Sequence, residues 1–265
     1  MEARPGRLKR LLHTLLVLDT PTHPAQVEEI RVTLPSLPSA FHGARIAVVS
    51  DVHLPDALMT TQALTRQVAA LRPDAIFMTG DLTNAYATFA DQELGRLAKG
   101  LAAIAPCFAV PGNHEWRLGR ESRYRQILTA CGVRYLCDNF ADWQKDGQTL
   151  RLFGMGRRRP APLPVEDRPA IVLAHKPQYF PYYQQARWQL VVCGHAHGGQ
   201  MRAKGRGLYA PGQGFLPLYT AGAYTDGHTT MVVSRGLGNS SIPGRFGNQP
   251  HLPLLVLSPA DKKHL

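Results

Sequence analysis

Short apolar runs that stop at an aspartate or a histidine constrain this chain more than any other feature. Residues 44–51 and 74–81 are two such runs, rich in valine, isoleucine and phenylalanine, and each ends in an aspartate. Residues 63–72, between them, carry apolar side chains at helical spacing. Strand, helix and strand in this order favour parallel strands covered by helices. The sequence therefore predicts an α/β fold.

The rest of the chain predicts further elements of the same kind. Residues 27–38 alternate apolar and polar side chains like a half-buried strand, residues 89–104 have helical spacing, and residues 107–115 begin as a third buried strand. The second half contains less helix, and we expect its strands to form a mixed second sheet. These strands are predicted within residues 133–136, 149–156, 170–175, 190–195, 229–236 and 252–259.

The ends of five predicted strands carry side chains with nitrogen or oxygen donors. These ends hold five of the chain's 11 histidines, which a random scatter would rarely produce. Because open α/β sheets place their sites at the carboxyl ends of strands, we expect the donors to meet in one crevice. Residues two apart in extended backbone point to the same side, which would allow each such pair to chelate. The donors are Asp51, His53, Asp81, Asn113, His114, Glu115, His175, His195 and His197.

These residue types support catalysis by two metal ions. Imidazole, carboxylate and amide donors without a thiolate suit manganese, iron or zinc. Two such ions about 3.5 to 4 Å apart lower the pKa of a shared water and clamp phosphoryl oxygens. Gly80, Gly112 and Gly194 each precede a donor, where glycine lets the chain turn sharply and approach a metal or a phosphate. For any one motif alone, an ordinary glycine-containing turn is the alternative.

Five segments resemble the signature blocks of the calcineurin-like metallophosphoesterase superfamily: SDVHLPD, MTGDLTN, VPGNHEW, LAHKPQY and CGHAHGGQ. The resemblance runs from about residue 37 to the last strand. It implies a four-layer α/β/β/α sandwich with two mixed sheets. Residues 37–54 and the segments AHKPQ, GGQ, VSRGLG and PGRFGNQP also resemble a bacterial branch. That branch contains membrane-associated phosphodiesterases and enzymes that cleave the pyrophosphate of UDP-2,3-diacylglucosamine.

The resemblance also implies a role for each donor. Asp81 is expected to bridge two ions. His114 corresponds to a histidine outside the ligand set that protonates the leaving oxygen or stabilises charge on the phosphoryl group, which is worth roughly 10²- to 10⁴-fold in rate. The family often has aspartate in place of Glu115 and threonine in place of Ala196, and neither is a ligand. The implied ligands are Asp51, His53, Asp81 and His197 for one ion, and Asp81, Asn113, His175 and His195 for the other.

We therefore expect a metallophosphoesterase that hydrolyses a phosphodiester or pyrophosphate of a lipid-linked or nucleotide substrate, through attack by a metal-bound hydroxide. Arg202 is predicted to contact the substrate, because guanidinium pairs well with phosphate; a solvated basic position is the alternative. The competing functions are a nuclease or phosphomonoesterase of the same fold, and a non-catalytic metal-binding scaffold. Protein phosphatase activity is disfavoured, since GDLTNAYA lacks the aspartate and arginine that follow this motif in such enzymes.

The net charge of the chain and its amino-terminal residues indicate which partners it could bind. Lysine and arginine number 30 against 19 aspartates and glutamates, and the formal charge of +11 favours anionic partners. No groove signature for single-stranded nucleic acid is evident, so nucleic acid is not expected. Residues 1–25 are predicted as an amphipathic helix and a connector before one domain at 26–265. The leucines and basic residues of this helix either lie on an anionic lipid surface or pack on the domain.

Cysteine usage and hydropathy bear on location. Four cysteines without a CxxC pair favour a reducing compartment. No apolar run approaches the roughly 20 residues that a membrane-spanning helix requires. We thus expect a cytoplasmic protein with peripheral contact at the inner membrane surface through its amino-terminal helix. The arginine- and proline-rich residues 156–169 are expected to form a solvated loop; the alternative is that Arg157, Arg158 and Arg159 bind a second phosphate or an anionic headgroup.

Overall fold

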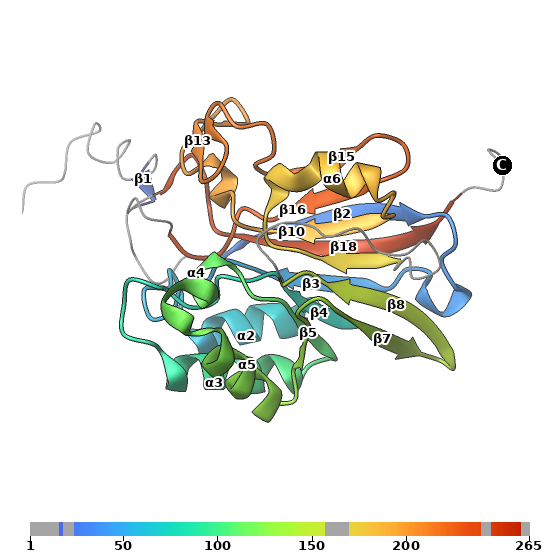
Figure 1. Ribbon diagram of the computed structural model, residues 1–265, viewed down its shortest axis with the longest axis horizontal. Helices are drawn as coiled ribbons and strands as arrows, with labels where there is room; N and C mark the ends of the chain where they lie inside the picture. Colours follow the sequence, from blue (N-terminus) through green and yellow to red (C-terminus); the bar gives the residue numbers. More distant parts are fainter. Residues whose placement is uncertain (1–15, 18–23, 157–169, 240–244, 261–265) are drawn as a thin grey trace, which may run out of the picture.

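Two six-stranded sheets packed face to face form the centre of the protein (Figure 1). The computed structural model describes residues 16–17, 24–156, 170–239 and 245–260. Helices α2 (Thr61–Ala70), α3 (Asp91–Ala102) and α5 (Glu121–Ala130) cover one sheet, and α6 (Phe180–Gln185) covers the other. This arrangement confirms the four-layer α/β/β/α sandwich with two mixed sheets.

The first sheet has the order β2-β18-β3-β4-β5-β6. Strands β3 to β6 are parallel, whereas β18 is parallel to β2 and antiparallel to β3. Residues 133–136 and 252–259 were expected in the second sheet and belong to this one, because a strand's own sequence does not specify its partner. The strands are β2 (Gln26–Leu34), β3 (Arg45–Val49), β4 (Ala75–Met78), β5 (Cys107–Ala109), β6 (Arg134–Tyr135) and β18 (His251–Pro259).

The second sheet has the order β15-β16-β10-β9-β8-β7. Its four central strands are parallel, and the edge strands β7 and β15 are antiparallel to their neighbours. The sequence pattern did not predict β7, β15 or α5. The strands are β7 (Asn139–Lys145), β8 (Gln148–Gly154), β9 (Ile171–Leu173), β10 (Leu190–Cys193), β15 (Gly222–Thr225) and β16 (Thr230–Val233).

Alternation along β3 shows how the sequence builds the layers. Ile46 and Val48 point into the core between the two sheets, while Ala47 and Val49 pack against the helices. Both faces of a central parallel strand are buried here. This burial explains why the strand is a continuous apolar run rather than an alternating one.

Three short ribbons lie outside the two sheets: β1 (Leu16–Val17) with β17 (Arg245–Phe246), β11 (Arg202–Ala203) with β12 (Arg206–Gly207), and β13 (Tyr209–Ala210) with β14 (Gly214–Phe215). Residues 16 and 17 fall within the predicted amphipathic helix but form a strand, because they pair with β17. The other residues of the predicted amino-terminal helix, and residues 157–169 of the predicted loop, lie outside the described residues. No helix within the described ranges is long and apolar enough to cross a bilayer.

Candidate active site

The strand ends of both sheets meet at one edge of the sandwich. In the first sheet the Asp51 amide donates to the Gly80 carbonyl at 3.0 Å, and in the second the Gly194 amide donates to the His175 carbonyl at 3.2 Å. The His195 amide donates to the Asp51 carboxylate and so joins the two sheets. Seven predicted metal ligands lie at this edge, and all but one are buried: Asp51, His53, Asp81, Asn113 (half-buried), His175, His195 and His197.

Five of these seven residues have left-handed backbone rather than the extended backbone expected from the sequence. The chain turns sharply as it leaves each strand, so the donors project across the sheet edge instead of continuing along one face. This region is unfavourable for residues with a Cβ, and such conformations concentrate at functional sites. The φ angles are 51° at Asp51, 57° at His53, 51° at Asp81, 68° at His195 and 46° at His197.

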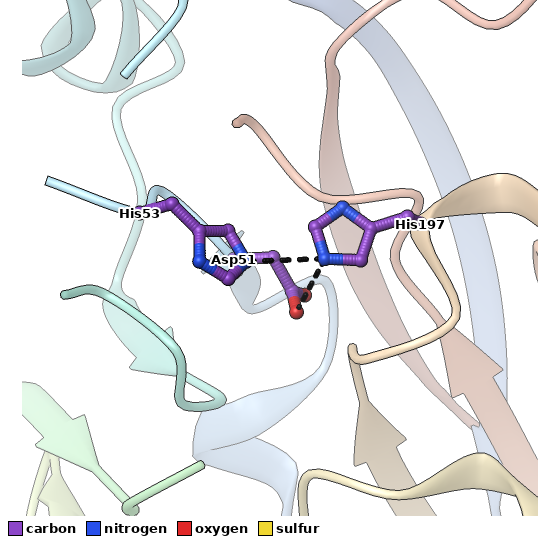
Figure 2. A group of neighbouring side chains, drawn as sticks. All are labelled: Asp51, His53 and His197. Carbon is purple, nitrogen blue, oxygen red and sulfur yellow. Dashed lines mark hydrogen bonds and ion pairs between the residues drawn. The ribbon is translucent and has the colours of Figure 1, made fainter. Parts of the chain in front are cut away.

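Asp51, His53 and His197 form a first donor group (Figure 2). Nε2 of His53 lies 3.1 Å from Nε2 of His197, which lies 3.5 Å from Oδ1 of Asp51. The Ser50 hydroxyl donates to Oδ2 of Asp51 at 2.5 Å and orients the carboxylate. Two buried ring nitrogens that face each other can share only one proton, so a cation between them satisfies both lone pairs. The geometry fits a metal ion.

Asp81, Asn113, His175 and His195 form a second donor group. Nε2 of His175 lies 3.1 Å from Oδ2 of Asp81 and 3.2 Å from Oδ1 of Asn113. The same nitrogen lies 3.2 Å from Nδ1 of His195. Nδ1 of His175 lies 2.7 Å from the Thr79 carbonyl, which can only accept, so Nδ1 carries a proton. Nε2 is thereby turned toward the other donors.

Asp81 is a member of the second donor group and lies close to His53 of the first. The Asp81 carboxylate lies close to His175 and His195 on one side, and close to His53 and His114 on the other. Burial opposes ionisation of Asp81, but His175 and the neighbouring histidines hold its pKa well below the usual range. Burial also disfavours the charged His175, yet the Asp81 and Asp51 carboxylates outweigh it and raise the His175 pKa to about 9. Asp81 is therefore an ionised carboxylate between the two groups.

Burial keeps the other imidazoles neutral. It lowers the pKa of His53 to about 3, and it holds the pKa values of His195 and His197 well below their ordinary value. The nearby Asp81 carboxylate acts in the opposite direction on all three but does not compensate. Neutral imidazole is the form that ligates a metal ion. These three histidines are therefore in the protonation state that binds a metal ion.

Glycine is required where the loops approach the carboxylates. A Cβ at Gly112 would overlap Oδ1 of Asp81, and a Cβ at Gly194 would overlap the Ser50 hydroxyl and Oδ2 of Asp51. The close approach expected from the sequence is therefore found, and the groups approached are the candidate ligands themselves.

Glu115, at the third position of α4 (Asn113–Trp116), holds the loops of the second group together. Its buried carboxylate accepts from the amides of Gly112 at 2.8 Å, Asp81 at 2.9 Å and Thr83 at 3.0 Å. The Thr83 hydroxyl donates to it at 3.0 Å. Burial, with a contribution from Asp81, raises the pKa of Glu115 to about 7. Sequence reasoning identified Glu115 only as a non-ligand and missed this positioning role.

His114 presents a ring N–H to the site. The Ala85 amide donates to its Nδ1 at 2.9 Å, so Nδ1 carries no proton and Nε2 does. Nε2 lies 4.0 Å from Oδ2 of Asp81, and the side chain is 12% exposed. Burial lowers the pKa of His114, which favours the neutral ring.

Arg245 and Asn248 support His197, and sequence reasoning assigned neither a role. Nη2 of the buried Arg245 lies 3.4 Å from Nδ1 of His197, and Nε donates to the Gly238 carbonyl at 3.1 Å. Nδ2 of Asn248 donates to the His197 carbonyl at 2.7 Å. Burial lowers the pKa of Arg245 to about 10, and Asp51 opposes this shift. The available signal was the segment RFGN, 48 to 51 residues beyond His197 in sequence.

A cavity of about 430 Å³ opens beside the second donor group. Asn113, His175 and His195 form part of its wall, and Trp116 and Lys176 add an aromatic and a cationic side chain. It has room for a substrate group beyond the phosphorus.

Arg202 is engaged with its own segment. Its guanidinium donates to the Gly198 carbonyl at 2.7 Å, to the Thr220 hydroxyl at 3.1 Å and to the Gly205 carbonyl. These bonds hold the segment that follows the histidines. The substrate contact predicted for Arg202 stays a prediction.

Comparison with known sequences covers the part of the chain that carries the site. The sequence profile described as calcineurin-like phosphoesterase matches residues 44–199, which contain all seven candidate ligands. Phosphodiesterase YaeI of Escherichia coli K12 is 29% identical over 203 residues, and the match covers 70% of this chain and 71% of that protein.

Two further comparisons differ in what they cover. A transmembrane protein with metallophosphoesterase domain of Danio rerio is 25% identical over 262 residues; the match covers 89% of this chain but only 58% of that longer protein. The crystal structure of TT1561 of Thermus thermophilus superposes with a TM-score of 0.50 at 15% identity, over 73% of this chain and 90% of that one. This structural likeness concerns the fold alone.

Proposed function

Since this chain belongs to the calcineurin-like phosphoesterase family, whose members hydrolyse phosphoester bonds, we propose that it cleaves a phosphodiester or a pyrophosphate with the help of two divalent metal ions. The observation that carries the proposal is the position of Asp81, whose carboxylate lies near His175 and His195 of the second donor group and near His53 of the first. The similarity to a protein named as a phosphodiesterase supports the diester as the first substrate class to test.

The donor set fits two ions. Seven buried or half-buried oxygen and nitrogen donors without a thiolate suit manganese, iron or zinc. Bound there, such ions would acidify a water and withdraw charge from the phosphoryl oxygens. We assign Asp51, His53, Asp81 and His197 to one ion, and Asp81, Asn113, His175 and His195 to the other.

His114 acts on the phosphoryl group through its Nε2–H in this proposal. Because the Ala85 amide occupies Nδ1, the ring cannot turn its protonated nitrogen away from the site without losing that bond. A neutral ring with Nε2–H stabilises negative charge as it develops on a phosphoryl oxygen or on the leaving oxygen. The fixed hydrogen bond therefore favours the charge-stabilising role over proton donation.

The cavity beside the second group would hold the part of the substrate that does not react. Lys176 supplies positive charge to its wall, and Trp116 supplies an aromatic surface of which 38% is exposed. This combination suits an anionic group attached to an apolar or aromatic body, as in a lipid-linked or nucleotide phosphodiester. A pyrophosphate would place its second phosphate on the same cationic wall.

We also propose a cytoplasmic location with peripheral contact at the inner membrane surface. The four cysteines are free thiols, which is usual in a reducing compartment. The basic, leucine-rich first 20 residues and the relative named as a transmembrane protein support the membrane contact.

Hydrolysis of bis-p-nitrophenyl phosphate by the purified chain tests the enzymatic proposal. Activity with added manganese is expected, and p-nitrophenyl phosphate, a nucleotide-linked pyrophosphate and plasmid DNA extend the panel to monoesterase, pyrophosphatase and nuclease activity. Inactivity on every substrate with manganese, zinc, iron and cobalt would contradict catalysis. Metal analysis of the same preparation separates an inactive metal-bound scaffold from a protein that binds no metal.

A further inference from the structure

Exposed apolar side chains gather on one segment, Met201 to Leu218. The described residues expose ten large hydrophobic side chains, and six of them lie within this segment. The most exposed of all are Phe215 at 85%, Leu218 at 75% and Leu216 at 74%. Scattered single apolar residues are ordinary on a surface, but a cluster of this kind marks an interaction site.

The segment is held in a defined shape. Strands β13 and β14 pair as a short ribbon, and the Leu216 amide donates to the Leu208 carbonyl at 2.9 Å. The Gln213 side chain donates to the Tyr219 carbonyl at 2.8 Å and accepts from the Tyr219 amide at 2.9 Å. Leu216 has a φ of 51°, which is unfavourable for a leucine. The fold therefore presents these apolar side chains outward on a fixed support.

Two exposed basic side chains lie in the same segment as the apolar cluster. Lys204 and Arg206 are exposed within the same segment. Residues 168–225 contain no aspartate or glutamate at all. A segment that combines exposed apolar side chains with exposed cations and contains no carboxylate suits the boundary between acyl chains and anionic headgroups.

The segment also adjoins the active site and the amino-terminal strand. Pro211 and Gly212 line the cavity that His175 and His195 line. Met201 bridges to Phe246 of β17, the strand that pairs with β1. Figure 1 shows β13 standing out from the two sheets at the end of the molecule where β1 also lies. A surface bound at this tip would lie beside the entrance to the site.

We propose that residues 201–218 form an interfacial docking surface for an anionic lipid bilayer. Phe215, Leu216 and Leu218 enter the boundary between headgroups and acyl chains, and Lys204 and Arg206 pair with the headgroup phosphates. The inference deepens the membrane contact proposed above but uses a different part of the chain, and it does not depend on catalysis. A second copy of the chain is a poorer occupant, because stable protein interfaces bury about 20 to 30 residues on each side and this segment exposes six large apolar side chains.

Flotation of the full chain with vesicles tests the proposal. We expect binding to phosphatidylcholine vesicles that contain a quarter phosphatidylglycerol. The variant F215S/L218S should bind these vesicles at least about tenfold more weakly. The variant K204E/R206E should lose binding mainly to the anionic vesicles. Tyr182→Ser, at another exposed aromatic side chain 54% accessible on α6, is the matched control and should bind normally.

Several outcomes would overturn the proposal. They are equal flotation of F215S/L218S and the unaltered chain, no flotation of the unaltered chain, and loss of binding confined to a variant with Leu11 and Leu15 changed to Ser. Sedimentation that shows a dimer abolished by F215S/L218S would assign the surface to self-association instead. Hydrolysis of bis-p-nitrophenyl phosphate in solution should be unchanged in F215S/L218S. Failure of the enzymatic proposal would leave the flotation result intact, so the two are distinguishable.

Discussion

The backbone amide of His195 donates to both carboxylate oxygens of Asp51, at 3.0 Å each, across the junction of the two sheets. The two residues are 144 positions apart in sequence, and each closely follows the end of a central parallel strand. The bond orients a candidate ligand through the backbone of another. Much of the site's geometry is therefore built into the fold, which is the condition for a preorganised metal centre.

Gly194→Ala should disrupt this junction. The added Cβ would overlap the Ser50 hydroxyl and Oδ2 of Asp51, so the carboxylate has to move. We expect lower metal content, a roughly 10²-fold loss of turnover and a loss of about 1 to 3 kcal/mol in unfolding free energy. Elemental analysis, hydrolysis assays and urea denaturation measure the three effects. Gly95→Ala is the control: it lies in α3, with its nearest contact 3.9 Å away, and should be neutral or stabilising by about 0.5 to 1 kcal/mol.

Glu115→Ala should destabilise the protein strongly. It leaves the amides of Gly112, Asp81 and Thr83 without their acceptor, and each unpaired buried donor costs about 1 to 3 kcal/mol. We expect a loss of about 3 kcal/mol or more in urea denaturation, and a smaller loss for Glu115→Gln, which keeps one acceptor oxygen. Glu93→Ala removes an exposed carboxylate and should change stability by about 0.5 kcal/mol or less. A Glu115→Ala protein as stable as this control would refute the positioning role.

His114→Ala should lower kcat about 10²- to 10³-fold, because it removes a donor that stabilises charge on the phosphoryl group, while both ions are retained. The side chain lies near the Asp81 carboxylate, but its Nδ1 is taken by the Ala85 amide, and we assign it no ion. Steady-state kinetics and metal content of the same sample check the two halves of this prediction. His228→Ala, at an exposed histidine, should leave both unchanged. If His114→Ala instead lost its ions, His114 would be a ligand and our assignment would be incorrect.

The layers of the fold and the set of converging donors were predictable because they depend on local patterns. Buried parallel strands read as continuous apolar runs, and their carboxyl ends must meet at a sheet edge. The pairing of β18 between β2 and β3 was not predictable, since it joins residues more than 200 positions apart whose local pattern fits either sheet.

The supporting side chains were not predictable for a related reason. Glu115, Arg245 and Asn248 are polar residues whose burial and partners exist only in the folded chain. The left-handed backbone at Asp51 and His195 also escaped prediction, because nothing in the identity of aspartate or histidine requires it. The local sequence therefore predicts which residues form the site better than it predicts the contacts that hold them in place.

Acidification should destabilise the protein through His251, a buried residue outside both donor groups. Its Nδ1 accepts from the Arg235 amide at 3.2 Å, and its Nε2 lies 3.0 Å from Oε2 of Glu28. Burial lowers the pKa of His251 below 6.5, although Glu28 opposes the shift, while His251 lowers the pKa of Glu28 below 4.5. As the pH falls below 6.5 the unfolded chain binds a proton at His251 that the folded chain does not, so stability is lost at up to about 1.4 kcal/mol per pH unit.

Glu28 adds to the loss only below pH 4.5, because its contribution is complete above that value. Urea denaturation at about pH 7 and about pH 5 should therefore show a larger loss for the unaltered chain than for His251→Gln. Parallel losses in the two proteins would mean that His251 takes up its proton equally well in the folded state.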